Sequence, residues 1–190
     1  MADTKSSKGL SVTGVGAVVC ARHDMRLPCG VGDLQKGEWY DALLHKVELA
    51  YSYILSLDMY VNMDYIFFSS IAGSTLKSIN VSYDIACQWY KKVWTRMKSL
   101  PTDLQFDPTM KTTHFFVPKF HLAAHIKTCQ TRFSFNWTPG VGHTDGKAPE
   151  RGWANINHVA TSTKEMGPGS RRDVLNDHFD NVNWKKKCFR

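Results

Sequence analysis

The chain has 190 residues, which is enough for one domain with a sizeable core but hardly for two. Its formal net charge of +7 and its pI of about 9.2 favour a polyanionic partner, because lysine and arginine side chains gain affinity when counterions leave the phosphates. The polar N-terminus does not resemble a signal peptide, and the most apolar run, residues 50–61, is too short to span a bilayer. These features argue against secreted and membrane-spanning classes, and we expect a soluble intracellular protein.

Five cysteines stand at positions 20, 29, 87, 129 and 188. Their number is odd, and their spacing matches no disulfide framework, which indicates a reducing compartment.

The first half of the chain predicts one strand and a long helical region. Residues 1–13 are expected to form a disordered tail, and Val15–Ala21 reads as a short buried strand. Pro28, Gly30 and Gly32 predict a loop after it. From Glu38 to Ile71 the pattern is helical, as one long helix or as two helices joined near Asp58.

The second half predicts two more strands separated and followed by helices. One helical face carries Ile85, Trp89, Val93 and Met97 at a spacing of four. Pro149 suits the first turn of a helix, where no amide donor is needed. The expected elements are strands over 79–83 and 113–117, helices over 120–131 and 148–165, a last short helix over 170–179, and a basic tail over 185–190.

Two carboxylates are candidate ligands for a catalytic metal ion. Asp84 follows the strand that ends at Tyr83, where the backbone would hold it rigidly, although an aspartate between a strand and a helix is also a common helix cap. Glu150 opens a predicted helix, where it could equally favour the helix dipole or pair with Arg151. Asp145 is a third candidate, with a turn residue as its simpler interpretation.

A second candidate site is a zinc site. His121, His125 and Cys129 fall on one face of the predicted helix over 120–131 and could supply three ligands. Cys20 and His23, spaced C-x-x-H, could join them from a distant segment. The alternative is that these side chains serve ordinary core or surface roles.

Basic residues near the C-terminus are candidate contacts for a nucleic acid. Trp137, Trp153 and Trp184 could stack on exposed bases, although we expect these three in the core. The candidate phosphate contacts are Lys164, Arg171, Arg172, Lys185, Lys186 and Lys187.

Several contiguous stretches resemble the Kyakuja-Dileera-Zisupton (KDZ) transposases. The resemblance covers nearly the whole chain after residue 10, and its motifs are specific. They are Cys20-Ala21-Arg22-His23, Gly30-Val31-Gly32-Asp33-Leu34-Gln35-Lys36-Gly37-Glu38, Asn62-Met63-Asp64-Tyr65-Ile66-Phe67-Phe68-Ser69, Val81-Ser82-Tyr83-Asp84-Ile85-Ala86-Cys87-Gln88-Trp89, Phe116-Val117-Pro118-Lys119-Phe120-His121-Leu122, and Ala148-Pro149-Glu150-Arg151-Gly152-Trp153 through Ser170-Arg171-Arg172-Asp173.

The resemblance implies a cut-and-paste DNA transposase with a ribonuclease H-like core. In such a core, acidic residues on the first strand, the fourth strand and a late helix bind two divalent cations, Mg²⁺ or Mn²⁺. The resemblance assigns the fourth-strand aspartate to Asp84 and the late glutamate to the motif over residues 146–151. It implies attack on a phosphodiester, first by water and then by a DNA 3′-hydroxyl. It also implies that the protein binds transposon ends, forms a homo-oligomer and is located in the nucleus.

Three departures from the family pattern stand out. First, residues 1–13 contain no replacement for the first-strand aspartate. Second, Lys147 stands where the family usually has glutamate. Third, residues 41–60 are an insert, which we interpret as a retained intron. We therefore expect an α/β fold with an incomplete ribonuclease H-like core, a mixed sheet and flanking helices over 14–184. Its expected function is that of a transposase fragment with little or no catalysis. The alternative is a non-catalytic DNA-binding or zinc-stabilised module.

Overall fold

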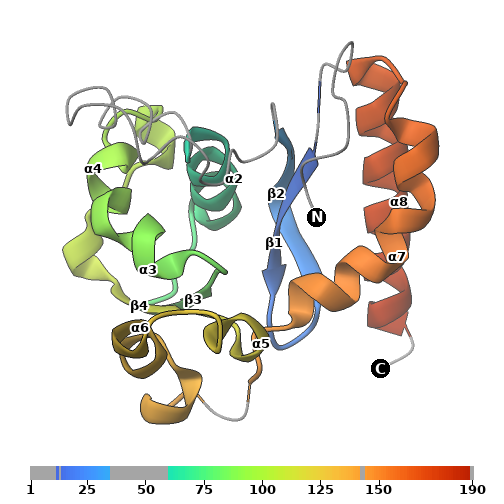
Figure 1. Ribbon diagram of the computed structural model, residues 1–190. Helices are drawn as coiled ribbons and strands as arrows, with labels where there is room; N and C mark the ends of the chain where they lie inside the picture. Colours follow the sequence, from blue (N-terminus) through green and yellow to red (C-terminus); the bar gives the residue numbers. More distant parts are fainter. Residues whose placement is uncertain (1–11, 13, 35–59, 142–143, 189–190) are drawn as a thin grey trace, which may run out of the picture.

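The computed structural model describes residues 12, 14–34, 60–141 and 144–188 and shows a mixed α/β protein (Figure 1). The expected N-terminal tail except Val12, the expected insert except Tyr60, and the part of the predicted helical region over 38–59 lie outside these residues, whereas α2 (Val61–Ile71) is described. The described strands form two separate two-stranded sheets, β1–β2 and β3–β4. None of the described helices is both long and apolar enough to cross a membrane.

The first sheet is an antiparallel hairpin of β1 (Gly14–Cys20) and β2 (Met25–Leu34). The predicted loop over 28–32 is wrong, because these residues lie within β2. Pro28 and Cys29 occupy exposed positions in an irregularity of the register, where residues 27–30 have no partner in β1, so proline loses no ladder hydrogen bond there. A Cβ on Gly16 would lie 2.8 Å from Met63 Sδ, so glycine lets α2 approach the hairpin closely.

The second sheet is a parallel pair of β3 (Ser78–Ser82) and β4 (Thr112–Phe116), which confirms the two strands predicted there. Parallel neighbours need a crossover connection. Here it consists of α3 (Ala86–Trp89), η1 (Tyr90–Lys92), α4 (Val93–Met97), η2 (Thr102–Leu104) and η3 (Pro108–Met110). Of the predicted apolar face, Trp89, Val93 and Met97 are buried and Ile85 is half-buried.

The core between α2 and the crossover contains one charged pair. Asp64 and Arg96 are 1% and 5% exposed and form a two-point ion pair, in which Arg96 Nη2 donates to Asp64 Oδ1 at 3.0 Å and Arg96 Nε donates to Oδ2. Trp89 Nε1 also donates to Asp64 Oδ1 at 2.6 Å. Burial raises the pKa of the Asp64 carboxyl, and the hydrogen bonds from Arg96 and Trp89 oppose that effect.

The C-terminal half is helical and packs on the hairpin. It contains α5 (Lys119–Leu122), α6 (Lys127–Arg132), η4 (Phe135–Trp137), α7 (Ala148–Thr163) and α8 (Pro168–Cys188). Ile156 of α7 and Leu175 and Phe179 of α8 form a buried cluster with Val15 and Val31 of the hairpin. Figure 1 shows the hairpin between the α7–α8 pair and the group formed by α2, α3 and α4.

Two helix predictions in this half need correction. The predicted helix over 120–131 is divided, because Ile126 has an extended backbone (φ −63°, ψ 155°) and serves as the N-cap of α6. The last helix was predicted to end at Phe179 but continues to Cys188. Lys185, Lys186 and Lys187 therefore lie in the last turns of α8, where cations favour the helix dipole.

Candidate metal centre

Asp84 lies just beyond the carboxyl end of β3. The Tyr83 amide donates to Phe116 O at 3.0 Å, which extends the β3–β4 ladder by one residue before the chain turns into α3. Because β3 and β4 are parallel, the chain leaving β4 starts at the same edge of the sheet. That chain forms α5, which brings His121 next to Asp84.

Glu150 is brought to the same edge by the loop that precedes α7. Asp145 anchors this loop: its Oδ1 accepts from the Lys147 amide at 2.9 Å, and its carbonyl oxygen accepts from the Lys119 amide at 3.0 Å. Gly146 has φ +74°, and a Cβ there would lie 2.7 Å from Ser82 Oγ and 3.0 Å from Pro118 Cα. The loop therefore packs directly on the end of β3 and on the start of α5.

Asp84, His121 and Glu150 form a cluster that we call the carboxylate site. His121 Nε2 lies 3.1 Å from Glu150 Oε1 and 3.5 Å from Asp84 Oδ1, and one ligand atom from each residue lies within 4.8 Å of the others. The three side chains are 48%, 33% and 38% exposed in chain order, so the site is open to solvent.

The donor set of the carboxylate site fits a divalent cation. Glu150 Oε2 is shielded from solvent and has no hydrogen-bond partner among the described residues, although its side chain as a whole is partly exposed. Two carboxylates and an imidazole in one cluster are ligands that Mn²⁺ accepts, and the carboxylates suit Mg²⁺. A cation would also satisfy the shielded oxygen of Glu150.

The basic neighbours of the carboxylate site are engaged elsewhere. Lys147 Nζ lies 5.2 Å from the centroid of the Phe120 ring. Arg151 Nη2 lies 3.0 Å from Asp24 Oδ1 in the hairpin turn, and Arg151 Nη1 lies 3.4 Å from Asp145 Oδ2. Glu150, and not position 147, is thus the residue of the 146–151 motif that meets Asp84.

The three residues predicted to share a zinc site are divided between two clusters. His121 belongs to the carboxylate site, whereas His125 and Cys129 gather around Cys87, which the sequence interpretation did not include. The division follows from the break between α5 and α6, since residues 121, 125 and 129 share one face only in a continuous helix. Among the described residues, Cys20 and His23 join neither cluster and contact each other, with 3.3 Å between Cys20 Sγ and His23 Nδ1.

The residues predicted to contact nucleic acid differ in their surroundings. Arg171 is only 7% exposed. Its Nε donates to Asp33 Oδ1 at 3.0 Å and its Nη1 donates to Thr163 O at 3.1 Å. Arg171 therefore stabilises the corner between α7 and α8 and is not available at the surface. Lys186 Nζ donates to the Asp24 carbonyl oxygen. The exposed members of the predicted set are Lys164, Arg172, Lys185 and Lys187.

The tryptophan prediction is only partly right. Trp153 packs at the edge of the α7–α8 cluster, but Trp137 and Trp184 are 75% and 62% exposed. Trp184 lies on α8 directly before Lys185. An exposed indole beside exposed cations is suited to stacking on a base.

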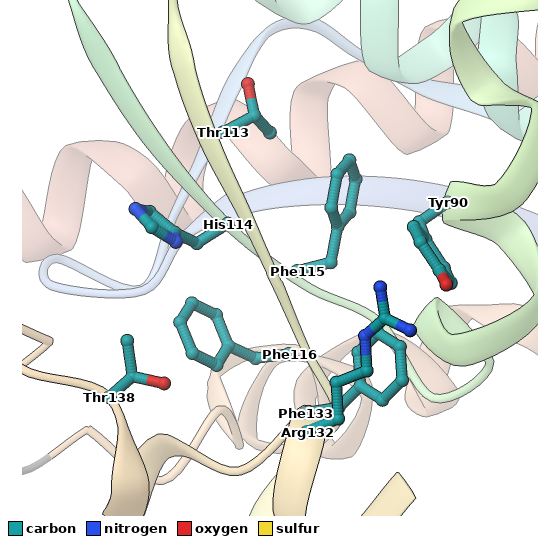
Figure 2. A pocket seen from close by; sticks show the side chains of 8 residues that line it. All are labelled: Tyr90, Thr113, His114, Phe115, Phe116, Arg132, Phe133 and Thr138. Carbon is teal, nitrogen blue, oxygen red and sulfur yellow. The ribbon is translucent and has the colours of Figure 1, made fainter.

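A separate pocket of about 300 Å³ lies along β4 (Figure 2). Figure 2 shows Tyr90, Arg132 and Phe133 on one side of the strand and His114 and Thr138 on the other. The Arg132 guanidinium lies over the Tyr90 and Phe133 rings, at 5.2 and 5.6 Å from their centroids. No residue of this pocket belongs to the carboxylate site.

Comparisons with known proteins identify one family. The family model of the Kyakuja-Dileera-Zisupton transposases matches the chain in two segments, residues 1–50 and 44–183. The junction between the segments falls within the stretch interpreted as an insert, residues 41–60. Comparison with curated proteins and with solved structures gave no match. Since the family match covers most of the chain, this protein belongs to the Kyakuja-Dileera-Zisupton transposase family.

Proposed function

We propose that the described residues form a ribonuclease H-like domain from its second strand onward. A hairpin, a helix, a parallel strand pair with a helical crossover and a late helix carrying a glutamate follow one another in the order that such a core requires. A central first strand between β1 and β3 would join the two small sheets into one. β3 then becomes the fourth strand, and Asp84 stands at its end.

We infer that the carboxylate site holds Mg²⁺ or Mn²⁺ for cleavage and transfer of DNA strands. The observation that carries this function is the convergence of Asp84 and Glu150, which are distant in sequence, at one edge of the sheet. Divalent cations bound there would polarise the phosphodiester and lower the pKa of the attacking water. Asp84 and Glu150 supply the negative charge that holds them.

His121 is a potential third ligand of the cation. Its Nε2 lies 3.1 Å from Glu150 Oε1 and 3.5 Å from Asp84 Oδ1. An imidazole ligand suits Mn²⁺ better than Mg²⁺, which prefers oxygen, and we expect the tighter binding for Mn²⁺.

The carboxylate site has two of the three carboxylates that the family mechanism requires. Among the described residues no third carboxylate lies within reach of Asp84 and Glu150. We therefore propose that the domain acting alone has little or no strand-transfer activity, and that a first strand would contribute the missing aspartate.

Titration of the whole chain with Mn²⁺, followed by the electron paramagnetic resonance signal of the free ion, tests the proposed site. We expect Asp84→Asn and Glu150→Gln each to weaken binding at least about tenfold, because each removes a charged ligand. Glu165→Gln is the matched control, since Glu165 is exposed beside Lys164 and away from the site. Equal Mn²⁺ affinity in Asp84→Asn and the unaltered chain would refute the site.

Strand transfer with a pre-cleaved transposon end and a plasmid target tests the second half of the proposal. We expect no joined product above background from this chain with either cation. Joined product that disappears in Asp84→Asn would show that the chain is active by itself, while the proposed metal site would stand.

A non-catalytic DNA-binding module is a second candidate function, favoured by the exposed basic residues and Trp184 on α8. Binding through phosphates weakens with salt: the logarithm of the binding constant falls linearly with the logarithm of the salt concentration, with a slope of about −0.9 per phosphate neutralised. We expect Arg172→Ala and Lys187→Ala each to reduce the magnitude of this slope by about one. Arg171 is buried, and we do not expect it to contact DNA. Binding that does not change with salt would exclude this candidate.

A further inference from the structure

Cys87, His125 and Cys129 form a compact group of soft ligands beside the carboxylate site. One ligand atom from each lies within 4.8 Å of the others, and Cys87 Sγ lies 3.5 Å from His125 Nδ1. Cys87 is 7% exposed, while His125 and Cys129 are half-buried. The three residues come from three places: α3, the link between α5 and α6, and α6.

The spacing of the group fits tetrahedral zinc. Bond lengths of about 2.3 Å to sulfur and about 2.0–2.1 Å to nitrogen place a sulfur and a nitrogen ligand about 3.5–3.6 Å apart, and two sulfur ligands about 3.8 Å apart. The observed distance of 3.5 Å between Cys87 Sγ and His125 Nδ1 equals the first of these separations. The other two pairs of ligand atoms lie within 4.8 Å and would have to approach to about 3.5–3.8 Å to hold the ion.

The surroundings of the group are largely apolar. Ala86, Val117 and Phe133 are buried against Cys87, and Leu122 and Tyr90 pack at the border of this cluster. Burial, and after it the neighbouring Cys129 thiol, raise the pKa of Cys87, so a zinc ion would have to displace the thiol proton. An apolar shell limits solvent access to a bound ion and strengthens its bonds to thiolates.

We propose that Cys87, His125 and Cys129 bind one Zn²⁺ ion, with water or a further ligand in the fourth position. The ion would tie α3 to the α5–α6 segment. Asp84 precedes Cys87 by three residues and His121 precedes His125 by four, so the same tie fixes the distance between two members of the carboxylate site. The role of this zinc is structural.

Substitution of Co²⁺ for zinc in the reduced whole chain tests the site, because tetrahedral cobalt with thiolate ligands has characteristic charge-transfer and visible bands. We expect the thiolate-to-cobalt bands to saturate at one equivalent of Co²⁺, with a charge-transfer intensity that corresponds to two thiolates. Cys87→Ser, Cys129→Ser and His125→Ala should each weaken binding at least about tenfold. Cys29→Ser, at an exposed position on β2, is the matched control and should bind as the unaltered chain does.

Two further variants separate this site from its alternatives. His121→Ala and Asp84→Asn should retain the cobalt spectrum, because both residues belong to the carboxylate site. Loss of the spectrum in His121→Ala would overturn the proposed ligand set, and a chain without thiolate-to-cobalt bands would overturn the zinc site altogether. The test is independent of Mn²⁺ binding, so either site can fail without the other.

Alkylation of the unaltered chain keeps the proposal testable if the variants do not fold. With zinc present, we expect Cys87 and Cys129 to resist N-ethylmaleimide, while exposed Cys29 and Cys188 react. Removal of zinc with a chelator should expose the first two cysteines to modification, as mapped by mass spectrometry. Equal protection with and without zinc would show that burial alone shields them and would contradict the proposal.

Discussion

At the scale of single residues, Asp64 shows how a motif aspartate can serve the core. Its carboxylate is buried between Arg96 and Trp89. Replacing it would leave the Arg96 guanidinium buried without its ionic partner, and breaking a buried pair in this way costs about 3–5 kcal/mol. We expect Asp64→Ala to lower the free energy of unfolding in urea by that amount. Asp103→Ala, at an exposed position in η2, is the control and should lose less than about 0.5 kcal/mol.

Asp145 gives a prediction on pH. The hydrogen bond from the Lys147 amide is the main cause of its lowered pKa, with smaller help from Arg151 and Lys147 charges. A carboxyl whose pKa is lower in the folded state than in the unfolded chain stabilises the fold at pH values above the unfolded pKa of about 3.9. This stability is lost as the pH falls through the folded pKa. The side chain is 41% exposed, so the contribution is under about 1 kcal/mol.

Urea unfolding of the chain and of Asp145→Asn at pH 6 and at pH 3 measures this contribution. We expect the difference in free energy of unfolding between the two proteins to be larger at pH 6 and to shrink at pH 3. A difference that is the same at both values would show that the Asp145 charge contributes nothing to stability.

At the scale of elements, the loop before α7 determines where Glu150 lies. Gly146→Ala combines a positive φ, which costs about 1–2 kcal/mol for a residue with a Cβ, with overpacking against Ser82 and Pro118, which costs about 1–3 kcal/mol. Gly140→Ala is a matched control, because Gly140 has φ +80° but nothing within 4 Å of the added Cβ. We expect Gly146→Ala to be the more destabilising by about 1–3 kcal/mol in thermal or urea unfolding.

The same pair of variants links the loop to the carboxylate site. Movement of the loop away from β3 would carry Glu150 away from Asp84, so Gly146→Ala should also weaken Mn²⁺ binding, and Gly140→Ala should not. Equal stability and equal Mn²⁺ affinity in the two variants would show that the loop tolerates the added methyl group without moving.

At the scale of the whole molecule, the two small sheets leave strand edges without a described partner. An unpaired edge presents backbone donors and acceptors to another chain, and lysine is a common protection of natural edges. We expect the isolated chain to self-associate and the change Asn80→Lys on β3 to reduce this association. Asn157→Lys, on the exposed face of α7, adds the same charge away from the edges and should have no such effect.

Sedimentation velocity over a range of protein concentrations measures this association. The sedimentation coefficient should rise with concentration for the unaltered chain and for Asn157→Lys, and rise less for Asn80→Lys. A monomer at all concentrations would contradict the proposal that edges of β1 or β3 are available for pairing.

Much of the local structure follows from sequence pattern. The strands near 79–83 and 113–117, the helix that begins at Ala148 and the buried face of Trp89, Val93 and Met97 were predicted because period and proline position depend on neighbouring residues alone. The β2 prediction failed because Pro28 and Gly30, which usually mark loops, lie in an irregularity of the β1–β2 register, and Gly32 packs closely on Ile66 of α2. Patterns among neighbouring residues do not predict either feature.

The sequence by itself indicated the family and predicted Asp84 and Glu150 as candidate ligands, and its charge favoured a polyanionic partner. Only the tertiary structure decided which residues meet. It placed His121 between the two carboxylates, grouped Cys87 with His125 and Cys129, and withdrew Arg171 into an ion pair with Asp33. The physical reason is that parallel strands bring their carboxyl ends to one edge, and the break at Ile126 turns α6 away from α5. Both effects depend on contacts between segments far apart in the chain.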